Sequence, residues 1–421
     1  DTPFQLMKER VEGTPTIATW LCSQLQSGDI VGIDGQVNAV CDADALREVL
    51  HTKGILLNLS TDPLQELWGD RPALPKNKIT IQPLEFAGED VASKLSRLTT
   101  KLREQGADTM VVSALDEVAW LLNLRGTDVH CNPVFVAYCL VLPKKVTLYV
   151  DKDKIGDDVR DYLFQNHITV EDYNRLTDDL EQLHNHHMLL SPQTNAIIAD
   201  IAAKNNRVSY LPSPIATMKA IKNATEIEGF HRAMLRDGVA MVKFLRRLLP
   251  AVKAGGLTEM GVDRLLTSLR AEQPLFKDIS FDTIAAYADH GAIVHYEATP
   301  ETDCELQPKG FLLLDSGAQY QDGTTDITRT ISLGEPTEEE KHIYTLVLKG
   351  HIALSRTKFP KGAAGTQLDL SARYAMWQEG FNFGHGTGHG VGSYLNVHEG
   401  PHQIRMNWMP APIVEGMTVT D

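Results

Sequence analysis

The feature that most constrains this chain is one short run, Gly384-His385-Gly386-Thr387-Gly388-His389-Gly390-Val391-Gly392, in which five of nine residues are glycine. A helix is disfavoured here because each glycine costs about 1 kcal/mol relative to alanine in a helix interior. In an extended strand, side chains four positions apart point to the same face, so His385 and His389 would face one space that only Thr387 shares. Glycines also let a ligand or a metal ion approach the backbone closely. The run therefore predicts a crowded polar site.

A second cluster favours such a site over a flexible loop that merely carries two histidines. The apolar run Phe311–Leu314 ends abruptly in Asp315, as expected for a buried strand that delivers a carboxylate into a cavity. The turn signal Asp322-Gly323 and the β-rich residues around Asp326 then predict a hairpin. Two facing strands can bring both carboxylates together, although their register is left open. Such a buried pair repels itself unless a cation or a proton lies between the acids.

The residue types also indicate which metal would suit the site. Two carboxylates and an imidazole form a hard, oxygen-dominated set that favours manganese or a similar divalent ion over a thiolate-bound zinc. No two cysteines have the CxxC spacing of a zinc ribbon. Their odd number and scattered positions favour free thiols in a reducing compartment, the cytoplasm. The cysteines are Cys22, Cys41, Cys131, Cys139 and Cys304.

These motifs together resemble aminopeptidase P, an Xaa-Pro aminopeptidase of the pita-bread metallopeptidases, whose relatives include prolidase, methionine aminopeptidase and creatinase. The resemblance is to the three-domain cytosolic type. It is carried by Asp315–Thr330, Gly384–Gly392, Ser393–Pro401, Ala114–Gly126 and Gly291–Tyr296. It implies an α+β fold in which a pita-bread (creatinase/aminopeptidase) catalytic domain follows two α/β domains, the first of them incomplete.

The resemblance also implies a role for each matching residue. It makes Asp315, Asp326 and His389 ligands of two divalent metal ions, manganese by expectation, with Asp326 between them. A hydroxide that bridges the ions would attack the peptide bond and release the residue before proline. The family's other histidines bind substrate and move protons, and they match His295, His385 and His398. An imidazole suits this task because the proline nitrogen carries no hydrogen and must be protonated as it leaves. Which histidine donates that proton is left open.

The order of predicted elements gives the domain organisation. Turn-rich stretches separate residues 1–74, the carboxyl-terminal part of the first α/β domain, from 75–210, the second α/β domain. Residues 211–421 form the catalytic domain, in which helices followed by strands occur twice, as in a duplicated fold. Its first long helix is expected to end at Pro250. His402 is expected at the surface or rim, because it follows Pro401 on a loop.

The ends of the sequence and its charge bound the remaining expectations. Asp1 is not an initiator methionine, and the family's two further glutamate ligands would follow Thr420-Asp421, so we expect a catalytic domain truncated at its carboxyl end. A formal net charge of −15 argues against nucleic acid and anionic membrane as partners. The expected partners are proline-containing peptides and, by family likeness, a second copy in a homodimer.

Two other functions stay open. A prolidase-type dipeptidase would cleave only dipeptides, and Leu395–Pro401 favours aminopeptidase P instead. A non-catalytic pita-bread module would bind peptides or proteins after losing its metal ligands. The presence of Asp315, Asp326 and His389 speaks against that module.

Overall fold

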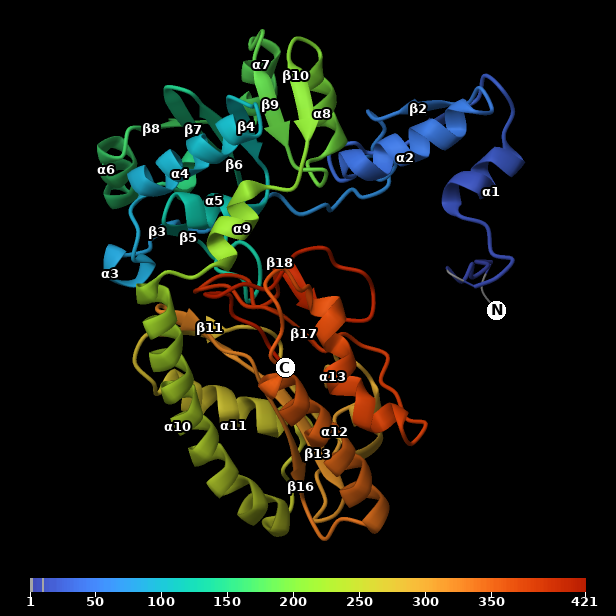
Figure 1. Ribbon diagram of the computed structural model, residues 1–421, viewed down its shortest axis with the longest axis vertical. Helices are drawn as coiled ribbons and strands as arrows, with labels where there is room; N and C mark the ends of the chain where they lie inside the picture. Colours follow the sequence, from blue (N-terminus) through green and yellow to red (C-terminus); the bar gives the residue numbers. More distant parts are fainter. Residues whose placement is uncertain (1–2, 10) are drawn as a thin grey trace.

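A short amino-terminal segment precedes the larger part of the molecule. The computed structural model describes residues 3–9 and 11–421. The segment contains two helices and a parallel pair of strands, and it lies to one side of the rest of the chain (Figure 1). Its elements are α1 (Ile17–Gln24), β1 (Ile30–Gly32), α2 (Val40–His51) and β2 (Leu56–Asn58).

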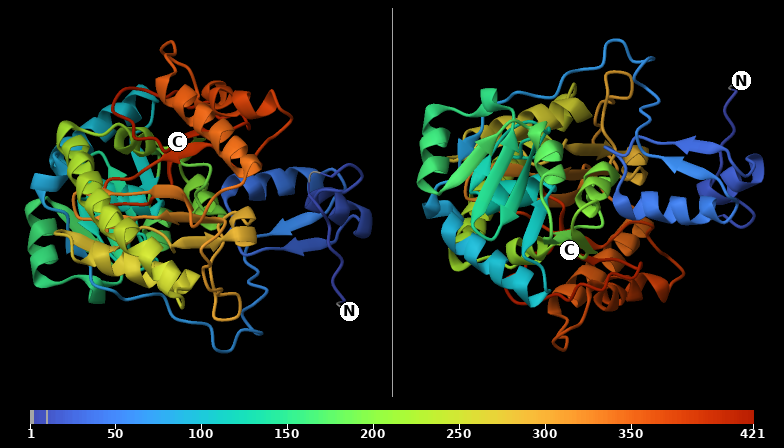
Figure 2. Two further views of the ribbon diagram at one scale, coloured as in Figure 1. Left: turned by 90° about the horizontal axis from the view of Figure 1, so that it is seen from below. Right: turned by 90° about the horizontal axis from the view of Figure 1, so that it is seen from above.

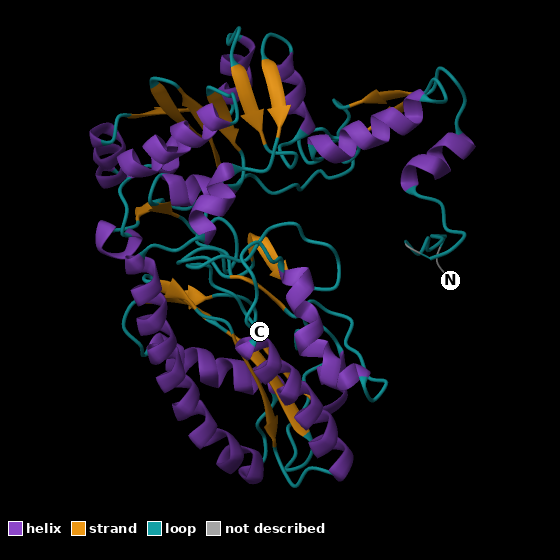
Figure 3. Ribbon diagram, in the orientation of Figure 1, coloured by secondary structure: helices purple, strands orange, loops and turns teal. Residues whose placement is uncertain are grey.

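A six-stranded mixed sheet forms the next region, shown with its flanking helices in Figure 3. The strands are β4 (Thr109–Val112), β6 (Ala137–Leu142), β7 (Lys145–Val150), β8 (Ile168–Glu171), β9 (His187–Leu190) and β10 (Arg207–Tyr210), in the order β10-β9-β4-β6-β7-β8. The helices are α4 (Val91–Glu104), α5 (Leu115–Leu121), α6 (Asp157–Gln165), α7 (Arg175–Glu181) and α8 (Ala196–Ala203). Shorter elements are β3 (Thr80–Ile81), α3 (Leu84–Ala87), β5 (Leu124–Arg125) and η1 (Lys152–Lys154).

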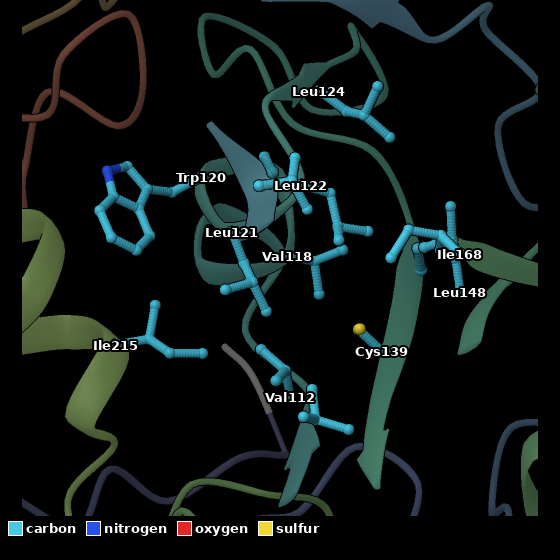
Figure 4. Packing of buried hydrophobic residues seen from close by; sticks show 14 of the residues in the cluster. Val112, Val118, Trp120, Leu121, Leu122, Leu124, Cys139, Leu148, Ile168 and Ile215 are labelled. Atoms are coloured by element: carbon cyan, nitrogen blue, oxygen red, sulfur yellow. The ribbon is translucent and has the colours of Figure 1, made fainter. Parts of the chain in front are cut away.

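The core of this region surrounds α5 and reaches the following helix, α9 (Pro214–Ala220). Val118 and Leu121 of α5 are fully buried, and Ile215 of α9 packs in the same cluster (Figure 4). Full burial of such a side chain contributes about 1.5–3 kcal/mol. The sheet region therefore holds α9 firmly, and α9 carries Lys219, which pairs with Glu399 beside the site described below.

The carboxyl-terminal region places strands between two pairs of helices (Figures 1 and 2). The helices are α10 (Ala224–Ala254), α11 (Glu259–Ala271), α12 (Glu338–Arg356) and α13 (Gly365–Trp377). The strands and the short 3-10 helix are β11 (Phe276–Ile279), β12 (Ile284–Tyr287), η2 (Ala288–Ala292), β13 (Phe311–Ser316), β14 (Ala318–Tyr320), β15 (Gly323–Thr324), β16 (Ile327–Ser332), β17 (Gly388–Gly390) and β18 (Glu399–Ile404). Two helices followed by strands occur twice along the chain, as predicted. This is the mixed helix-and-strand arrangement that the sequence predicts.

The predicted hairpin around Asp322-Gly323 is present. β13 pairs antiparallel with β16, and β14 pairs with β15 across the turn. The register that the sequence left open sets Asp315 opposite Thr328.

The predicted end of the first long helix at Pro250 is wrong. α10 continues through Pro250 to Ala254. Leu248 and Val252 flank this proline and are buried in the same cluster as α11. Packing on both sides of the proline therefore outweighs the hydrogen bond that it cannot donate. No helix in the part of the chain that the structure describes is both long enough and apolar enough to cross a membrane.

Candidate metal centre

The two predicted acids lie at adjoining strand ends. Asp315 is the fifth residue of β13, and its Oδ1 accepts a hydrogen bond of 2.7 Å from Thr328 Oγ1. Asp326 comes directly before β16, the partner strand. Burial and the nearby negative charge of Asp326 raise the pKa of Asp315, since both disfavour its ionised form. A bound cation would remove this repulsion.

His389 reaches the same place from β17, far along the chain. Its Nε2 lies 3.4 Å from Asp326 Oδ2. Its Nδ1 lies 2.9 Å from the Gly390 carbonyl oxygen, which can only accept a hydrogen bond. In the neutral ring Nδ1 therefore carries the hydrogen, and the lone pair of Nε2 faces the acids. Burial lowers the pKa of His389, but the contacts with Asp326 and the Gly390 carbonyl and the charge of Asp315 together outweigh this effect, and the net shift is upward.

The backbone around His389 explains why glycines surround it. The His389 N–H donates to Thr420 Oγ1 at 3.0 Å, and the Thr420 N–H donates to the His389 carbonyl at 2.9 Å. A Cβ at Gly388 would lie 1.9 Å from the Thr420 carbonyl oxygen. Only glycine permits this close approach without movement of the backbone.

Two carboxylates and an oriented imidazole are a donor set that fits divalent metal ions. Among the described residues, Asp315, Asp326 and His389 do not form a triad with all three donor atoms within 4.8 Å of one another. Asp326 instead contacts His389, while Asp315 lies close enough for its charge to raise the pKa of His389. The three side chains therefore approach one another without forming a single compact three-ligand group.

Three of the four predicted histidines lie together. The rings of His389 and His398 meet edge-on with their centroids 4.3 Å apart, and the His295 ring lies 6.3 Å from that of His398. Partial loss of hydration and the neighbouring His389 lower the pKa of His398. His385 is exposed, and its ring lies against Phe383 at 4.8 Å.

The prediction of one extended strand through the glycine-rich run is wrong for its first half. The strand covers only Gly388–Gly390, and Thr387 donates a hydrogen bond of 2.6 Å to Asp369 instead of sharing a space with the histidines. The reason is Arg373, a buried side chain of α13 that donates to the carbonyl of His385 at 2.8 Å and pairs with Asp369. These contacts hold the backbone before Gly388 in a bent rather than an extended conformation.

Buried charges next to the site were not predicted from the sequence. Glu399, at the start of β18, is 3% exposed and accepts from both Lys219 and Lys222, the first at 2.7 Å. Arg125 of β5 donates to the carbonyls of Tyr394 at 2.6 Å and Ser393 at 3.2 Å. These bonds hold the segment that carries His398, although each partner is distant in sequence.

His402 is a further correction. Its side chain is 0% exposed rather than at the surface, and its Nε2 lies 2.8 Å from the Thr418 carbonyl oxygen. The signal that could have indicated burial is the alternation of β18, in which His402 and Ile404 share the buried face.

A buried glutamate fixes the segment that carries His295. Glu259, at the start of α11, is 0% exposed and accepts from the Tyr287 N–H at 2.7 Å. It also contacts His290 Nδ1 at 2.8 Å and accepts from the Tyr296 hydroxyl at 3.0 Å. His295 itself has a left-handed φ of +58°. One carboxylate therefore holds the chain on both sides of this strained residue.

Comparisons with known proteins agree with this architecture. Residues 70–226 match the family described as Creatinase/Prolidase N-terminal domain, and residues 228–421 match Metallopeptidase family M24. A curated relative from Paracoccidioides lutzii, named probable Xaa-Pro aminopeptidase P, is 39% identical over 100% of this chain and 71% of its own length.

Solved structures give the same picture. The X-prolyl aminopeptidase of Caenorhabditis elegans, described as a cytosolic enzyme with a di-nuclear active site, superposes with a TM-score of 0.93 at 33% identity, covering 99% of this chain and 69% of that one. The Xaa-Pro dipeptidase of Bacillus anthracis gives 0.64 at 22% identity, covering 78% and 89% of the two chains, a likeness of fold alone.

Proposed function

Because this chain belongs to metallopeptidase family M24, and within it to the Xaa-Pro aminopeptidase P family, we propose that it releases the first residue of peptides with proline in second position. The observation that carries the proposal is the 3.4 Å approach of His389 Nε2 to Asp326 Oδ2 beside Asp315. These residues come from separate parts of the chain, and the fold brings them together.

Asp315, Asp326 and His389 would hold the metal ions in this proposal. When bound, two divalent ions supply a hydroxide nucleophile at neutral pH and polarise the scissile carbonyl. Thr328 orients the Asp315 carboxylate, and the Gly390 carbonyl orients the His389 ring. Both contacts keep the ligand atoms aimed at the site before any substrate arrives.

The remaining histidines would bind substrate and move protons. His398 lies between His389 and His295, where an imidazole can exchange a proton with a group held at the metal centre. The leaving proline nitrogen needs such a proton, because a tertiary amide has none of its own. His385 belongs to the proposal on the strength of its motif.

The test is hydrolysis of Xaa-Pro-Yaa tripeptides and Xaa-Pro dipeptides by the full-length protein, after chelation and again after adding Mn²⁺. Tripeptide cleavage that depends on Mn²⁺ is expected. Cleavage of dipeptides alone would favour prolidase, and no cleavage of either would favour a non-catalytic module.

A matched pair of variants ties the activity to the site. Asp326→Asn should lower kcat/KM by more than about 100-fold, the upper range for losing a residue that only supports a metal ligand. Asp289→Asn makes the same change at an exposed residue of η2 and should have little effect. Equal activity of the two variants would remove Asp326 from the site.

Finer features are proposed on the same basis. The metal is manganese because the donors are hard, and the location is cytoplasmic because the five cysteines are free thiols and the nematode relative is described as cytosolic. The protein forms a homodimer by family likeness, which sedimentation equilibrium would test. Its partners are proline-containing peptides, not nucleic acid or membrane, in keeping with a net charge of −15.

The division into domains is also a proposal. Boundaries after residues 74 and 210 would leave β1 and β2 in the first unit, the six-stranded sheet in the second and α9 onward in the third. Limited proteolysis near these boundaries would test it.

A further inference from the structure

An open cavity of about 360 Å³ lies on the side of His398 where two distant loops meet. One loop follows β5 and contributes His130 and Cys131, and the other precedes β12 and contributes Asp282. Asn396 and His398 line the same cavity. The proposed function leaves His130, Cys131 and Asp282 without a task.

These three side chains converge closely. Their donor atoms, one nitrogen, one sulfur and one oxygen, all lie within 4.8 Å of one another, and His130 Nε2 is 2.8 Å from Asp282 Oδ1. Cys131 is 8% exposed, whereas the His130 and Asp282 side chains are 67% and 50% exposed. The Cys131 thiol therefore lies in the wall of the cavity, and the His130 and Asp282 side chains lie at its open side.

The backbone holds Cys131 in an unusual conformation. Its φ is +62°, a left-handed value that costs a non-glycine residue energy, and it lies within the bridge between Val129 and Asn132. The Cys131 carbonyl accepts a hydrogen bond of 3.0 Å from the buried Gln319 side chain. The surrounding structure therefore fixes the strained residue whose sulfur joins the cluster.

We propose that His130, Cys131 and Asp282 form a binding site for a soft divalent cation of the zinc type, separate from the Asp315–Asp326–His389 centre. A set of sulfur, nitrogen and oxygen donors selects zinc or cadmium over manganese, because thiolate is a soft ligand. Three protein ligands leave the fourth tetrahedral position open toward the cavity. On binding, Cys131 releases its proton to solvent and the hydrogen bond between His130 and Asp282 opens.

The second compact group among the described residues, Glu259, His290 and Cys304, is a poorer site. Both Glu259 oxygens already accept hydrogen bonds, from the Tyr287 N–H and from the Tyr296 hydroxyl. Glu259 is fully buried, and a metal ion would have to displace these donors. Within the part of the chain that the structure describes, the side chains of the cluster at His130 have one such bond to break, between His130 and Asp282.

An ion at the proposed site would affect catalysis because the cavity is shared with His398. Its open position would capture a carboxylate or a water where a peptide passes. Zinc is therefore expected to slow peptide cleavage, a consequence that rests on the proposed function, whereas binding itself does not.

The experiment titrates Cd²⁺ into the full-length protein saturated with Mn²⁺ and follows the thiolate-to-cadmium absorption in the ultraviolet. The manganese centre has no cysteine and contributes nothing to this signal. About one thiolate-bound ion per chain is expected, and Cys131→Ser should abolish it. Cys304→Ser and Cys41→Ser, matched changes at other free thiols, should keep it. His130→Ala, at a largely exposed side chain, should weaken cadmium binding by roughly tenfold or more.

Each result decides one part of the proposal. Retention of the signal in Cys131→Ser, or its loss in Cys304→Ser, would overturn the site. If the site stands, zinc should inhibit tripeptide cleavage by the parent at concentrations roughly tenfold lower than those that inhibit Cys131→Ser. Equal inhibition would overturn the effect on catalysis alone. Absence of any peptidase activity would count against the proposed function and leave the cadmium result intact.

Discussion

The candidate metal centre is built from two halves that are held in different ways. The strand-held half, Asp315 and Asp326, lies on β13 and before β16, which pair over six successive positions. The loop-held half, His389 and His398, lies on and after β17, which has three residues and an irregular register with β18. Backbone pairing positions the acids, whereas the imidazoles depend on side chains from elsewhere.

The difference shows what each half needs. Leu312 and Leu314 anchor β13 in the core, and their burial fixes which face Asp315 takes. The loop-held half lacks such a ladder and is fixed by buried charges, Glu399 with Lys219 and Lys222, and Asp369 with Arg373. Removing one member of a buried ion pair is costly, because the remaining charge then has neither water nor an opposite charge beside it. Substitutions in the contacts that support the imidazoles should therefore lower the free energy of unfolding more than substitutions in the contacts that support the acids.

The largest effect is expected for Glu399→Gln. It removes the carboxylate that pairs with the buried Lys222 and leaves Lys219 paired with Asp116, so it should lower the free energy of unfolding by about 3–5 kcal/mol, as measured in urea. Glu272→Gln removes one partner of an exposed pair with Lys243 and should change stability little. Equal losses in the two variants would mean that buried charge does not hold this half.

A pH-dependent effect on stability is expected at Glu117, which contacts the start of α9, the helix that carries Lys219. It is 7% exposed and accepts from Ser213, the residue that caps α9 before Lys219. Burial raises the pKa of Glu117 to about 7, and the charge of Asp116 adds to this shift. The folded state then keeps a proton that the unfolded chain loses above pH about 4.5, the ordinary pKa of this group.

Stability from this group is therefore present at low pH and is lost as the pH rises from about 4.5 to 7. The loss is on the order of 3 kcal/mol, since each pKa unit corresponds to about 1.4 kcal/mol. Urea unfolding at a series of pH values should show this slope in the parent and not in Glu117→Gln. Glu104→Gln, at an exposed residue of α4, should keep the parent's slope. Parallel profiles for all three proteins would contradict the prediction.

A smaller effect is expected where the loop-held half meets Thr420. Gly388→Ala puts a Cβ against the Thr420 carbonyl and should cost about 1–3 kcal/mol as the backbone shifts. Titration calorimetry should show weaker Mn²⁺ binding, because His389 is the next residue. Gly384→Ala makes the same change in the same run, where nothing lies within 4 Å, and should be neutral. A neutral Gly388→Ala would mean that the close approach is not needed.

The two halves also differ in how much the sequence reveals. The strand-held half follows from local signals, an apolar run that ends in Asp315 and the turn at Asp322-Gly323, and the predicted hairpin is present. The loop-held half depends on partners far along the chain. Lys219 and Glu399 are 180 positions apart, and no local pattern predicts that they meet.

The errors have the same origin. Thr387 donates to Asp369 rather than facing the histidines because Arg373 of α13 binds the nearby carbonyl of His385. His402 is buried because β18 packs its face inward, although the preceding Pro401 suggests a loop. Hydrophobic periodicity and turn residues predict local secondary structure, whereas tertiary contacts decide where side chains such as Thr387 and His402 point.

The smallest effect on stability is expected for Thr328→Val in the strand-held half. Valine keeps the β-branched shape that suits β16 and removes only the hydroxyl that donates to Asp315 at 2.7 Å. The loss should be about 1 kcal/mol or less, because the ladder of β13 and β16 remains. Mn²⁺ affinity should fall by roughly tenfold, since Asp315 loses its orienting partner. Thr330→Val, two residues along the same face, should change neither stability nor Mn²⁺ affinity. A loss of stability in Thr328→Val as large as that in Glu399→Gln would contradict the distinction between the two halves. The acids would then depend on a single side-chain contact rather than on the backbone of paired strands.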